Sequence, residues 1–383
     1  MAKLNNISIG AFRGISDLTV NDLSQVNLIV GDNNCGKTSI LEAIQLLRAP
    51  EDINNVFRVS RNRDAYSGFS RIPIFDSFVN MLQGNTEKSI SISCQYQDKD
   101  VNLLSDYGTR AINISGIVRR VMFDANELRQ KDRLAYRETM VMDFDGGEIE
   151  EFIGEITTET TPLPITRDII KVNRFTSVTG RAINSNKRGT IKITYLSPIA
   201  HLIGNTFDRI IRNEKYKEIC IKMLKLFDDN IEDLLLLNLE SSYRPVEFVR
   251  NKITGLMPLS TYGDGIKKVL AIANAIAQSS DGILLIDEIE TAVHSKYYDD
   301  IFRFIVKASI QYNVQLFITT HSIEAVDGLL NTQVIDNVYS ESSDTIKVVT
   351  LRKDGTSGKT ISRSMTGKEV FNKREAFDFE VRI

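Results

Sequence analysis

The sequence predicts an α/β fold built on a parallel sheet, and three apolar runs of strand length carry that prediction. They span residues 26–30, 283–286 and 315–318. Strands that are apolar on both faces are typical of parallel sheets covered by helices. Glycine, acidic or hydroxyl residues follow each run at once, so we expect a ligand site where the carboxyl ends of these strands meet.

The first run leads into a phosphate-binding loop. Residues 31–38 read Gly-Asp-Asn-Asn-Cys-Gly-Lys-Thr, the pattern G-x-x-x-x-G-K-T, and a helical pattern follows over 39–48. The glycines let backbone N–H groups surround phosphate oxygens, the lysine reaches the terminal phosphates, and the threonine hydroxyl can bind Mg²⁺. The residues expected to bind nucleotide here are Gly31, Asn33, Asn34, Cys35, Gly36, Lys37, Thr38 and Ser39.

Two carboxylates follow the second run. We expect Asp287 to hold Mg²⁺ together with Thr38, and Glu288, which points to the other side of the strand end, to polarise the attacking water. Acidic residues often end strands, so the pair alone is a modest signal. Combined with a phosphate loop, it indicates nucleotide hydrolysis.

The third run ends in Thr319, Thr320 and His321. A lone histidine at a strand end is more often structural than functional. This strand, however, should neighbour the strand that carries Asp287. From that position His321 can stabilise the γ-phosphate and act in catalysis with Glu288 and Lys37.

A second anion-binding surface is predicted at residues 259–265, Leu-Ser-Thr-Tyr-Gly-Asp-Gly, just before a helical pattern over 266–278. This segment lies too far along the fold to reach the phosphate loop of its own chain. It would therefore serve a second subunit, through Ser260, Gly263, Asp264 and Gly265. The alternative is a turn that only caps the helix.

In this order the motifs resemble the ATP-binding-cassette (ABC) superfamily of P-loop NTPases, in the branch of the SMC, Rad50, RecF and OLD-type ATPases. The closest resemblance is to AAA15-type or OLD-like ATPases of bacterial anti-phage defence, with the ATPase subunit of PARIS-type systems as a candidate. Residues 11–15 look like the family's opening strand, residues 41–44 look like its first helix, and the match resumes over 191–335.

The resemblance implies an ATP hydrolase that uses ATP and Mg²⁺. It makes residues 259–265 the signature segment, Glu288 the catalytic base, His321 the switch histidine, and residues 290–294 the loop that links two sites. It also places Arg13 near the nucleotide base. Asp264 departs from the transporter-type signature, although Gly-Asp-Gly looks like the OLD-type version. No Q-loop glutamine can be placed, because residues 194–198 occupy its position.

The expected domains are an ABC-type ATPase head over residues 1–50 and 190–383 and an inserted β-rich lobe over 51–189. Alternating or β-rich stretches at 88–96, 111–123 and 148–157 predict strands in the lobe. No sustained heptads are present, so a long coiled-coil arm is excluded. Helical apolar spacing predicts a helical lid over 205–240 inside the head, and a hairpin arm is expected after residue 348.

Composition places the chain among cytoplasmic enzymes. Its net charge is −3, 42% of its residues are hydrophobic, and its three cysteines show no pairing pattern. Oxidation of Cys35 would be expected to block nucleotide binding. No long apolar stretch or signal-peptide pattern occurs, so no membrane association is expected.

Basic residues cluster in the insertion. They are Arg58, Arg61, Arg63 and Arg71 in one group and Arg167, Lys171, Arg174, Arg181, Lys187, Arg188 and Lys192 in another. This pattern indicates a surface for DNA or for an acidic phage protein, or else a solvated loop.

The preferred function is an ATPase that assembles as a homo-oligomer, at least a dimer of heads, through sandwiched ATP. It would sense infection and regulate a separate effector, such as a Toprim-type nuclease, because the residues after His321 are too few for such a domain. The alternative is a RecF-like ATPase clamp on DNA in repair or recombination. A scaffold that binds ATP with little turnover is a third possibility, against which Glu288 argues.

Overall fold

The structure is a computed structural model, and it describes residues 2–63, 72–98, 107–123, 147–176, 190–203, 210–239, 245–335, 345–377 and 379–382. Contacts divide the chain into two compact units. Unit 1 consists of Met1–Asn5, Val20–Leu41 and Lys192–Ile383, and unit 2 consists of Asn6–Thr19 and Glu42–Ile191. Helix α1 (Lys37–Leu46) runs across the boundary between them.

The division differs from the expected one near the N-terminus. Residues 42–50, which we had assigned to the head, belong to unit 2, and so do Asn6–Thr19. The reason is strand pairing: β2 (Ile7–Phe12) pairs antiparallel with β5 (Glu87–Asp98), which is far away in sequence. Sequence patterns show that a segment forms a strand, but not which partner it pairs with.

Unit 1 is an α/β structure. Its strands are β1 (Ala2–Leu4), β4 (Val26–Gly31), β9 (Ile193–Leu196), β10 (Ile231–Leu237), β11 (Val246–Asn251), β12 (Gly255–Pro258), β13 (Ile283–Ile286), β14 (Gln315–Thr319), β15 (Ile346–Lys353) and β16 (Thr360–Thr366). Its helices besides α1 are α6 (Ala200–Ile203), α8 (Glu214–Leu224), η2 (Leu259–Thr261), α9 (Asp264–Gln278), η3 (Ser295–Tyr297), α10 (Tyr298–Gln311), α11 (Ile323–Ile335) and α12 (Gly367–Phe377).

The main sheet of unit 1 has the order β16-β15-β4-β14-β13-β9. Its four pairings from β15 to β9 are parallel, which confirms the predicted parallel sheet. The residues of β4, β13 and β14 are all buried, as their apolar composition requires. β14 lies directly between β4 and β13, so the chain segments after these three strands meet at one edge of the sheet.

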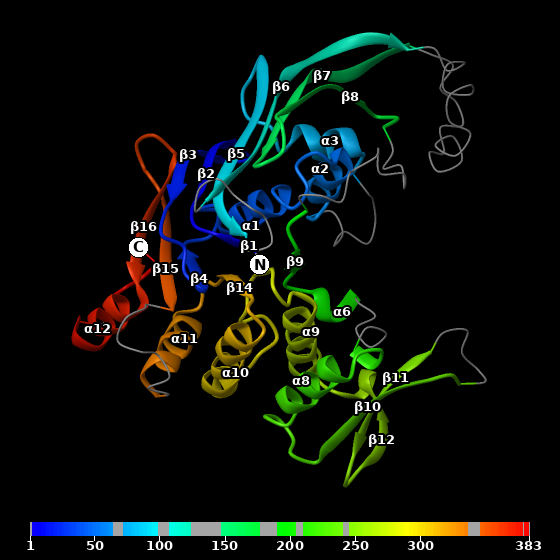
Figure 1. Cartoon of the computed structure of the whole chain (residues 1–383), viewed down its shortest axis with the longest axis vertical. Helices are drawn as coiled ribbons and strands as arrows, with labels where there is room; N and C mark the ends of the chain where they lie inside the picture. The colour runs from blue at the N-terminus through cyan, green and yellow to red at the C-terminus, as the bar shows by residue number, and fades with distance from the viewer. Residues whose placement is uncertain are drawn as a thin grey trace. The chain divides into compact units, whose positions relative to one another are not determined.

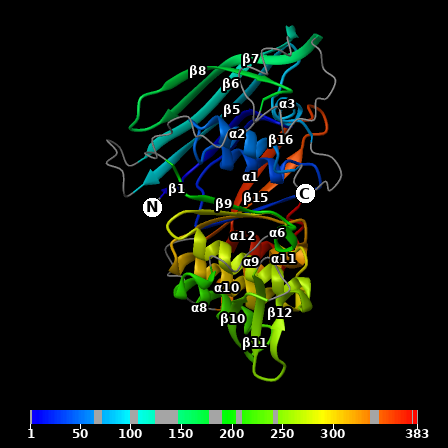
Figure 2. The same ribbon diagram turned by 90° about the vertical axis from the view of Figure 1, so that its right-hand side faces the viewer.

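Helices α8, α9 and α10 lie side by side in unit 1 (Figures 1 and 2). They share one hydrophobic core with the sheet, to which α9 contributes Val269, Leu270 and Ile272 and α10 contributes Ile301 and Phe302. Helix α9 carries these residues because its apolar positions recur at helical spacing. The helix that begins at the signature segment is therefore fixed to the sheet by packing.

The predicted helical lid over residues 205–240 is only partly helical. Helix α8 is present, but β10 follows it and pairs antiparallel with β11, and β12 completes a 3-stranded sheet. The run Ile231–Leu237 is rich in leucine, which suits either structure. This run forms a strand because its backbone hydrogen bonds are made with β11, which is not part of the run itself. Residues 205–209 and 240 of the predicted lid lie outside the described residues.

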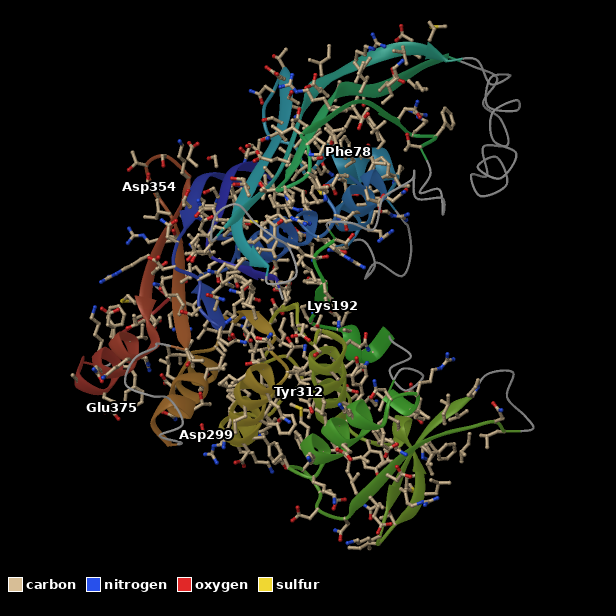
Figure 3. The ribbon with its side chains drawn as sticks, in the orientation of Figure 1. Phe78, Lys192, Asp299, Tyr312, Asp354 and Glu375 are labelled. Atoms are coloured by element: carbon tan, nitrogen blue, oxygen red, sulfur yellow. The ribbon has the colours of Figure 1, made fainter. Side chains whose placement is uncertain are left out.

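The hairpin arm expected after residue 348 is confirmed. β15 and β16 pair antiparallel from Lys347–Thr366 to Lys353–Thr360. Asp354 lies at the turn, at the outer end of the hairpin (Figure 3). Its side chain accepts hydrogen bonds from Ser357, which is the local bonding that favours a turn. Residues 355–359, which contain glycines and a lysine, are therefore the turn of this hairpin and not a second phosphate loop.

Unit 2 is the β-rich unit. Besides β2 and β5 it contains β3 (Ile15–Val20), α2 (Ile53–Ser60), α3 (Ile74–Val79), β6 (Gly108–Phe123), β7 (Gly147–Thr160) and β8 (Thr166–Asn173). The strands run in the order β3-β2-β5-β6-β7-β8. All three stretches in which we predicted strands are strands, because their alternating residues place one face on a core.

An aromatic chain packs the helices of unit 2 onto its sheet. Phe78 of α3 makes edge contacts with Phe57 of α2 and with Phe152 of β7, at centroid distances of 5.9 Å and 5.2 Å. In Figure 3, Phe78 lies between the helices and the strands. The helices thus cover one face of this sheet, and the edge-to-face geometry adds to the apolar burial.

No helix among the described residues is long and apolar enough to cross a membrane. Cys35, Cys94 and Cys220 are all free and buried. This agrees with the absence of a pairing pattern in the sequence.

Candidate nucleotide site

The phosphate loop lies between β4 and α1, the setting that the sequence predicted. Three of its residues have left-handed backbone conformations, with φ of 142° at Gly31, 63° at Asn34 and 108° at Gly36. Glycine tolerates such values at little cost, and asparagine is the next most tolerant residue type. Successive residues of opposite handedness turn backbone N–H groups toward a common centre, which is how loops of this kind bind anions.

Lys37 lies across the loop. Its Nζ donates to the backbone oxygens of Gly31 and Asp32 over 2.7 Å and 2.8 Å. These carbonyl groups keep the ammonium over the loop, where we predict it to meet the terminal phosphates. Cys35 is buried, and burial raises the pKa of its thiol, an effect that the charge of Lys37 opposes. The cysteine therefore favours its protonated, less reactive form.

Asp287 is bound by three hydroxyl groups at the end of β13. Oγ1 of Thr319 donates to Oδ1 over 2.6 Å, the hydroxyl of Tyr195 donates to Oδ2 over 3.0 Å, and Oγ1 of Thr38 lies 3.1 Å from Oδ2. The carboxylate is only 3% exposed. Donated hydrogen bonds offset the cost of burying a polar side chain. Asp287 is thus held facing Thr38, as expected for two ligands of one ion.

The residues fit a magnesium ion bound mainly through nucleotide. Mg²⁺ is usually bound by one or two carboxylates together with substrate phosphates and water, and it rarely occupies an all-protein cage. The described residues contain no group of three His, Cys, Asp or Glu side chains that could hold a metal. Thr38 and Asp287 are then the pair that would hold Mg²⁺, which would neutralise charge on the β- and γ-phosphates.

Glu288 follows in a strained backbone conformation, with φ of 47°. Its N–H donates to Oγ1 of Thr319 over 2.9 Å, and Oγ1 of Thr291 lies 3.5 Å from Oε2. A left-handed conformation is costly for a residue with a side chain, and such strain is found at functional sites when neighbouring contacts maintain it. Thr319 supplies that contact, because one hydroxyl binds both Asp287 and the backbone of Glu288.

His321 is held by a residue of the 290–294 loop. Its Nδ1 and its backbone N each lie 2.9 Å from Oε1 of Glu290. Glu290 is nearly buried, with 9% of its side chain exposed, whereas His321 is 51% exposed. An imidazole that donates from Nδ1 keeps Nε2 available for another partner. β14 and β13 are neighbours, as we predicted for the strands that precede His321 and Asp287.

The signature segment presents an uncapped helix start. Helix α9 begins after Gly263, and no side chain caps it. Ser260, Gly263 and Asp264 are exposed, and Asp264 binds Lys267 over 3.0 Å. This geometry differs from a serine-capped turn, because Ser260 lies within η2 and not at the helix cap. The role of Ser260, Gly263, Asp264 and Gly265 toward a second subunit's nucleotide stays a prediction.

Helix α9 also carries Lys268, which is 0% exposed. Its Nζ donates to the backbone oxygen of Pro198 over 3.0 Å. Burial lowers its pKa to about 8, although Asp287, Glu290 and Glu288 all act to raise it. The lysine thus joins the signature helix to the segment after β9 and balances the carboxylates at the end of β13. Tyr195, which binds Asp287, and Pro198, which binds Lys268, both lie in residues 194–198. This is the segment where a Q-loop would fall and where no glutamine occurs.

In unit 2, Arg13 and Arg63 both bind Glu42. Nε of Arg13 lies 2.6 Å and Nη2 of Arg63 lies 2.7 Å from Oε2 of this fully buried carboxylate. Arg13 has a φ of 50°, in the turn between β2 and β3. Paired cations are the usual condition for burying a carboxylate. Arg63 is therefore less available to a DNA phosphate than the sequence cluster suggested.

Lys171 and Lys192 are also less isolated than the sequence suggested. On β8, Lys171 pairs with Ile153 of β7, so Glu151 and Glu155 lie diagonally across from it on the same face. Lys192 belongs to unit 1, where it donates to the backbone oxygen of Ser280 over 2.9 Å. Arg71, Arg181, Lys187 and Arg188 lie outside the described residues.

Comparison with known proteins defines the class. The family model described as "AAA domain, putative AbiEii toxin, Type IV TA system" (AAA_21) matches residues 26–327, which include the phosphate loop, Asp287 and His321. The chain belongs to this family of P-loop ATPases. An "ATP/GTP phosphatase" of Helicobacter pylori is 22% identical over 353 residues, covering 88% of this chain and 89% of the relative.

The fold is that of SMC heads. The structure of the SmcHead bound to the C-winged helix domain of ScpA aligns with a TM-score of 0.51 and 13% identity, covering 96% of this chain and 99% of that one. The Smc head domain with an extended coiled coil, bound to the C-terminal domain of ScpA from Pyrococcus furiosus, gives 0.51 and 12%, covering 99% and 100%. The protein is an ATP-hydrolysing P-loop enzyme with an ABC-type, SMC-like head.

Four site residues were not assigned individual roles from the sequence, and Lys268, described above, is one of them. Tyr195 and Thr319 bind Asp287, and Glu290 binds His321. Thr319 and Glu290 lie within segments that the sequence analysis had already assigned to the site. Their position in the sequence could therefore have indicated a role in the site. Tyr195 lies in residues 194–198, where the sequence offers no Q-loop glutamine. Its contact with Asp287 could not be predicted, because it depends on the parallel register that pairs Tyr195 with Leu285.

Proposed function

We propose that this ATPase assembles through ATP sandwiched between two heads and regulates a separately encoded effector in anti-phage defence. The observation that carries the assembly step is the uncapped, exposed start of α9 at Gly263. A helix start with free N–H groups attracts anions. Ser260 and Gly263–Gly265 would then bind the γ-phosphate held by the phosphate loop of a second copy.

The chemistry follows from the residues of the head. Lys37 neutralises charge on the terminal phosphates, while Glu288 and His321 position the attacking water. Glu290 holds the His321 ring over 2.9 Å, and Thr319 holds Asp287 and the backbone of Glu288. Because the signature segment comes from the partner, turnover should require assembly.

Two observations support a defence role over DNA repair. The family description names a toxin of a type IV toxin–antitoxin system, which is a regulatory context. The described basic residues of β8 alternate with glutamates of β7, which weakens a continuous DNA-binding surface. The effector would be a Toprim-type nuclease or another toxin-like protein, and an acidic phage protein would be the trigger. A RecF-like clamp is the alternative that the experiment can detect.

The test uses Glu288→Gln expressed with its neighbouring genes. The variant should bind ATP, hydrolyse it slowly and accumulate the assembled state, because the base is lost and the binding groups remain. After ATP and Mg²⁺ are added, mass and composition are measured by light scattering and mass spectrometry. An assembly that holds a second protein and no nucleic acid supports the proposal, whereas a two-headed complex on DNA supports the clamp.

Lys37→Ala is the matched control. It should lose roughly 3 kcal/mol or more of transition-state stabilisation and fail to assemble with ATP. Wild-type turnover in Lys37→Ala would refute the phosphate-loop assignment. Wild-type turnover in Glu288→Gln would refute only the assignment of the base.

A further inference from the structure

Arg382 lies beside the switch histidine, within unit 1. Its Nη1 donates to the backbone oxygen of His321 over 3.2 Å. About a third of the side chain is exposed (35%). No motif marks this arginine, which follows α12 and is 61 positions from His321 in the sequence.

Glu380 fixes the guanidinium group. Nε and Nη2 of Arg382 each donate to a different carboxylate oxygen over 2.7 Å, and the backbone N of Arg382 donates to Oε1 over 3.0 Å. This two-pronged geometry is specific to arginine, because its donors form a planar fork. The hydrogen bonds from Arg382 lower the pKa of Glu380 to about 2, so the pair stays ionised at neutral pH.

The segment that carries this pair is fastened to the rest of unit 1. Val381 is fully buried, and its backbone oxygen accepts from Oγ1 of Thr350 on β15 over 2.8 Å. Arg374 donates to the backbone oxygen of Phe379 over 2.6 Å and also pairs with Asp327 of α11. The strand beside the phosphate-loop strand and the helix after His321 therefore both hold the segment in place.

The charge of Arg382 also interacts with two other acidic residues of unit 1. It is attracted by Asp32 in the phosphate loop and by Glu324 in the first turn of α11. A cation near a phosphate loop also favours the accumulation of negative charge there. Arg382 thus contacts His321 through a hydrogen bond and interacts with Asp32 and Glu324 through electrostatic attraction.

We propose that Arg382 is a positioning residue of the ATPase, which holds the His321 backbone so that the histidine ring lies correctly toward the phosphate loop during hydrolysis. This inference rests on the proposed role of His321. It predicts an effect on turnover and little effect on ATP affinity. An arginine that only stabilised the fold would change the melting temperature and leave the turnover of the folded protein unchanged.

The first experiment compares Arg382→Ala with Arg363→Ala, which removes an exposed cation from β16. We expect kcat of Arg382→Ala to fall about 10- to 100-fold, as small misplacements of catalytic groups do, while binding of a non-hydrolysable ATP analogue changes less than about twofold. Arg363→Ala should match the wild type. An unchanged kcat in Arg382→Ala, or an equal loss in Arg363→Ala, would overturn the proposal.

Chemical rescue separates misfolding from mispositioning. Guanidinium chloride at low millimolar concentration should restore part of the kcat of Arg382→Ala, because the partly exposed site beside Glu380 can accept the free ion. Sodium chloride at the same concentration should not. Arg382→Lys keeps the charge without the fork and should show an intermediate kcat. Loss of activity without rescue, in a protein with a lowered melting temperature, would show a purely structural role and refute the proposal.

A double-mutant cycle distinguishes this inference from the function on which it rests. If Arg382 acts through His321, then Arg382→Ala should cause little further loss of kcat in a His321→Ala background. Additive losses would refute action through His321. Unimpaired turnover in His321→Ala alone would instead refute the proposed role of the histidine, whatever Arg382→Ala does.

Discussion

The Nδ1 atom of His321 lies 2.9 Å from Oε1 of Glu290, and the backbone N of the same histidine lies 2.9 Å from the same oxygen. One carboxylate oxygen therefore fixes both the ring and the backbone of the histidine. The other oxygen of Glu290 is buried and has no hydrogen-bond partner within the described part of the chain. This carboxylate links the loop after Glu288 to the end of β14.

We expect Glu290→Gln to lower kcat. The amide keeps the shape of the side chain but removes the charge that orients the imidazole, so the ring would be held less firmly and turnover should fall about tenfold. Binding of a non-hydrolysable ATP analogue should change little. Steady-state kinetics beside the exposed control Glu232→Gln measure the effect, and equal kcat values in the two variants would contradict it.

Thr319→Val should uncouple ATP binding from hydrolysis. The substitution keeps the shape but removes the hydroxyl that donates to Asp287 and accepts from the backbone of Glu288. Two buried polar groups then lose a partner, which should cost roughly 1–3 kcal/mol of stability. Thr332→Val is the control, since its buried hydroxyl donates to the carbonyl of Leu329 in its own helix. Urea unfolding and ATPase assays test both variants, and equal behaviour would argue against the role of Thr319.

Gly31→Ala should disrupt the phosphate loop. A Cβ atom there would lie 2.2 Å from the backbone oxygen of Leu351 and 2.9 Å from Sγ of Cys35, and the φ of 142° disfavours any side chain. β15 would have to move away from the loop, so both stability and nucleotide binding should fall. Gly355→Ala meets no atom within 4 Å and serves as the control. A wild-type melting temperature in Gly31→Ala would show that the loop packs differently.

Lys268 should make stability depend on pH in the alkaline range. Burial lowers its pKa from 10.5 to about 8, so between these values the unfolded chain binds more protons than the native protein. The contribution of Lys268 to the free energy of unfolding therefore rises as the pH increases from about 8 to 10.5. The total gain is roughly 3 kcal/mol. Lys268→Met lacks this contribution.

The measurement is urea unfolding of wild type and Lys268→Met at several values between pH 7.5 and 10. The stability of the wild type relative to the variant should increase with pH. The exposed Lys307→Met is the control, and its difference from the wild type should stay flat. A constant difference for Lys268→Met would show that the lysine is not a buried cation.

Local spacing predicted the centre of the site. A phosphate loop needs consecutive residues between a strand and a helix, and a metal-binding aspartate needs a strand end, so Lys37, Thr38 and Asp287 can be read from neighbouring residues. The parallel strands β4, β13 and β14 were predicted for the same reason, because burial on both faces leaves continuous apolar runs. The hairpin of β10 and the membership of β2 in unit 2 were not predicted, since both depend on partners distant in sequence.

The sequence by itself determined that this chain has an ATPase head, because the chemistry of phosphate binding demands particular residues at fixed short spacings. Only the tertiary structure decided what surrounds those residues. Tyr195 reaches Asp287 through strand register, Glu290 reaches His321 across neighbouring strands, and Arg382 reaches the His321 carbonyl from a segment after α12. These contacts have no characteristic spacing, because folding and not chain neighbourhood brings their members together.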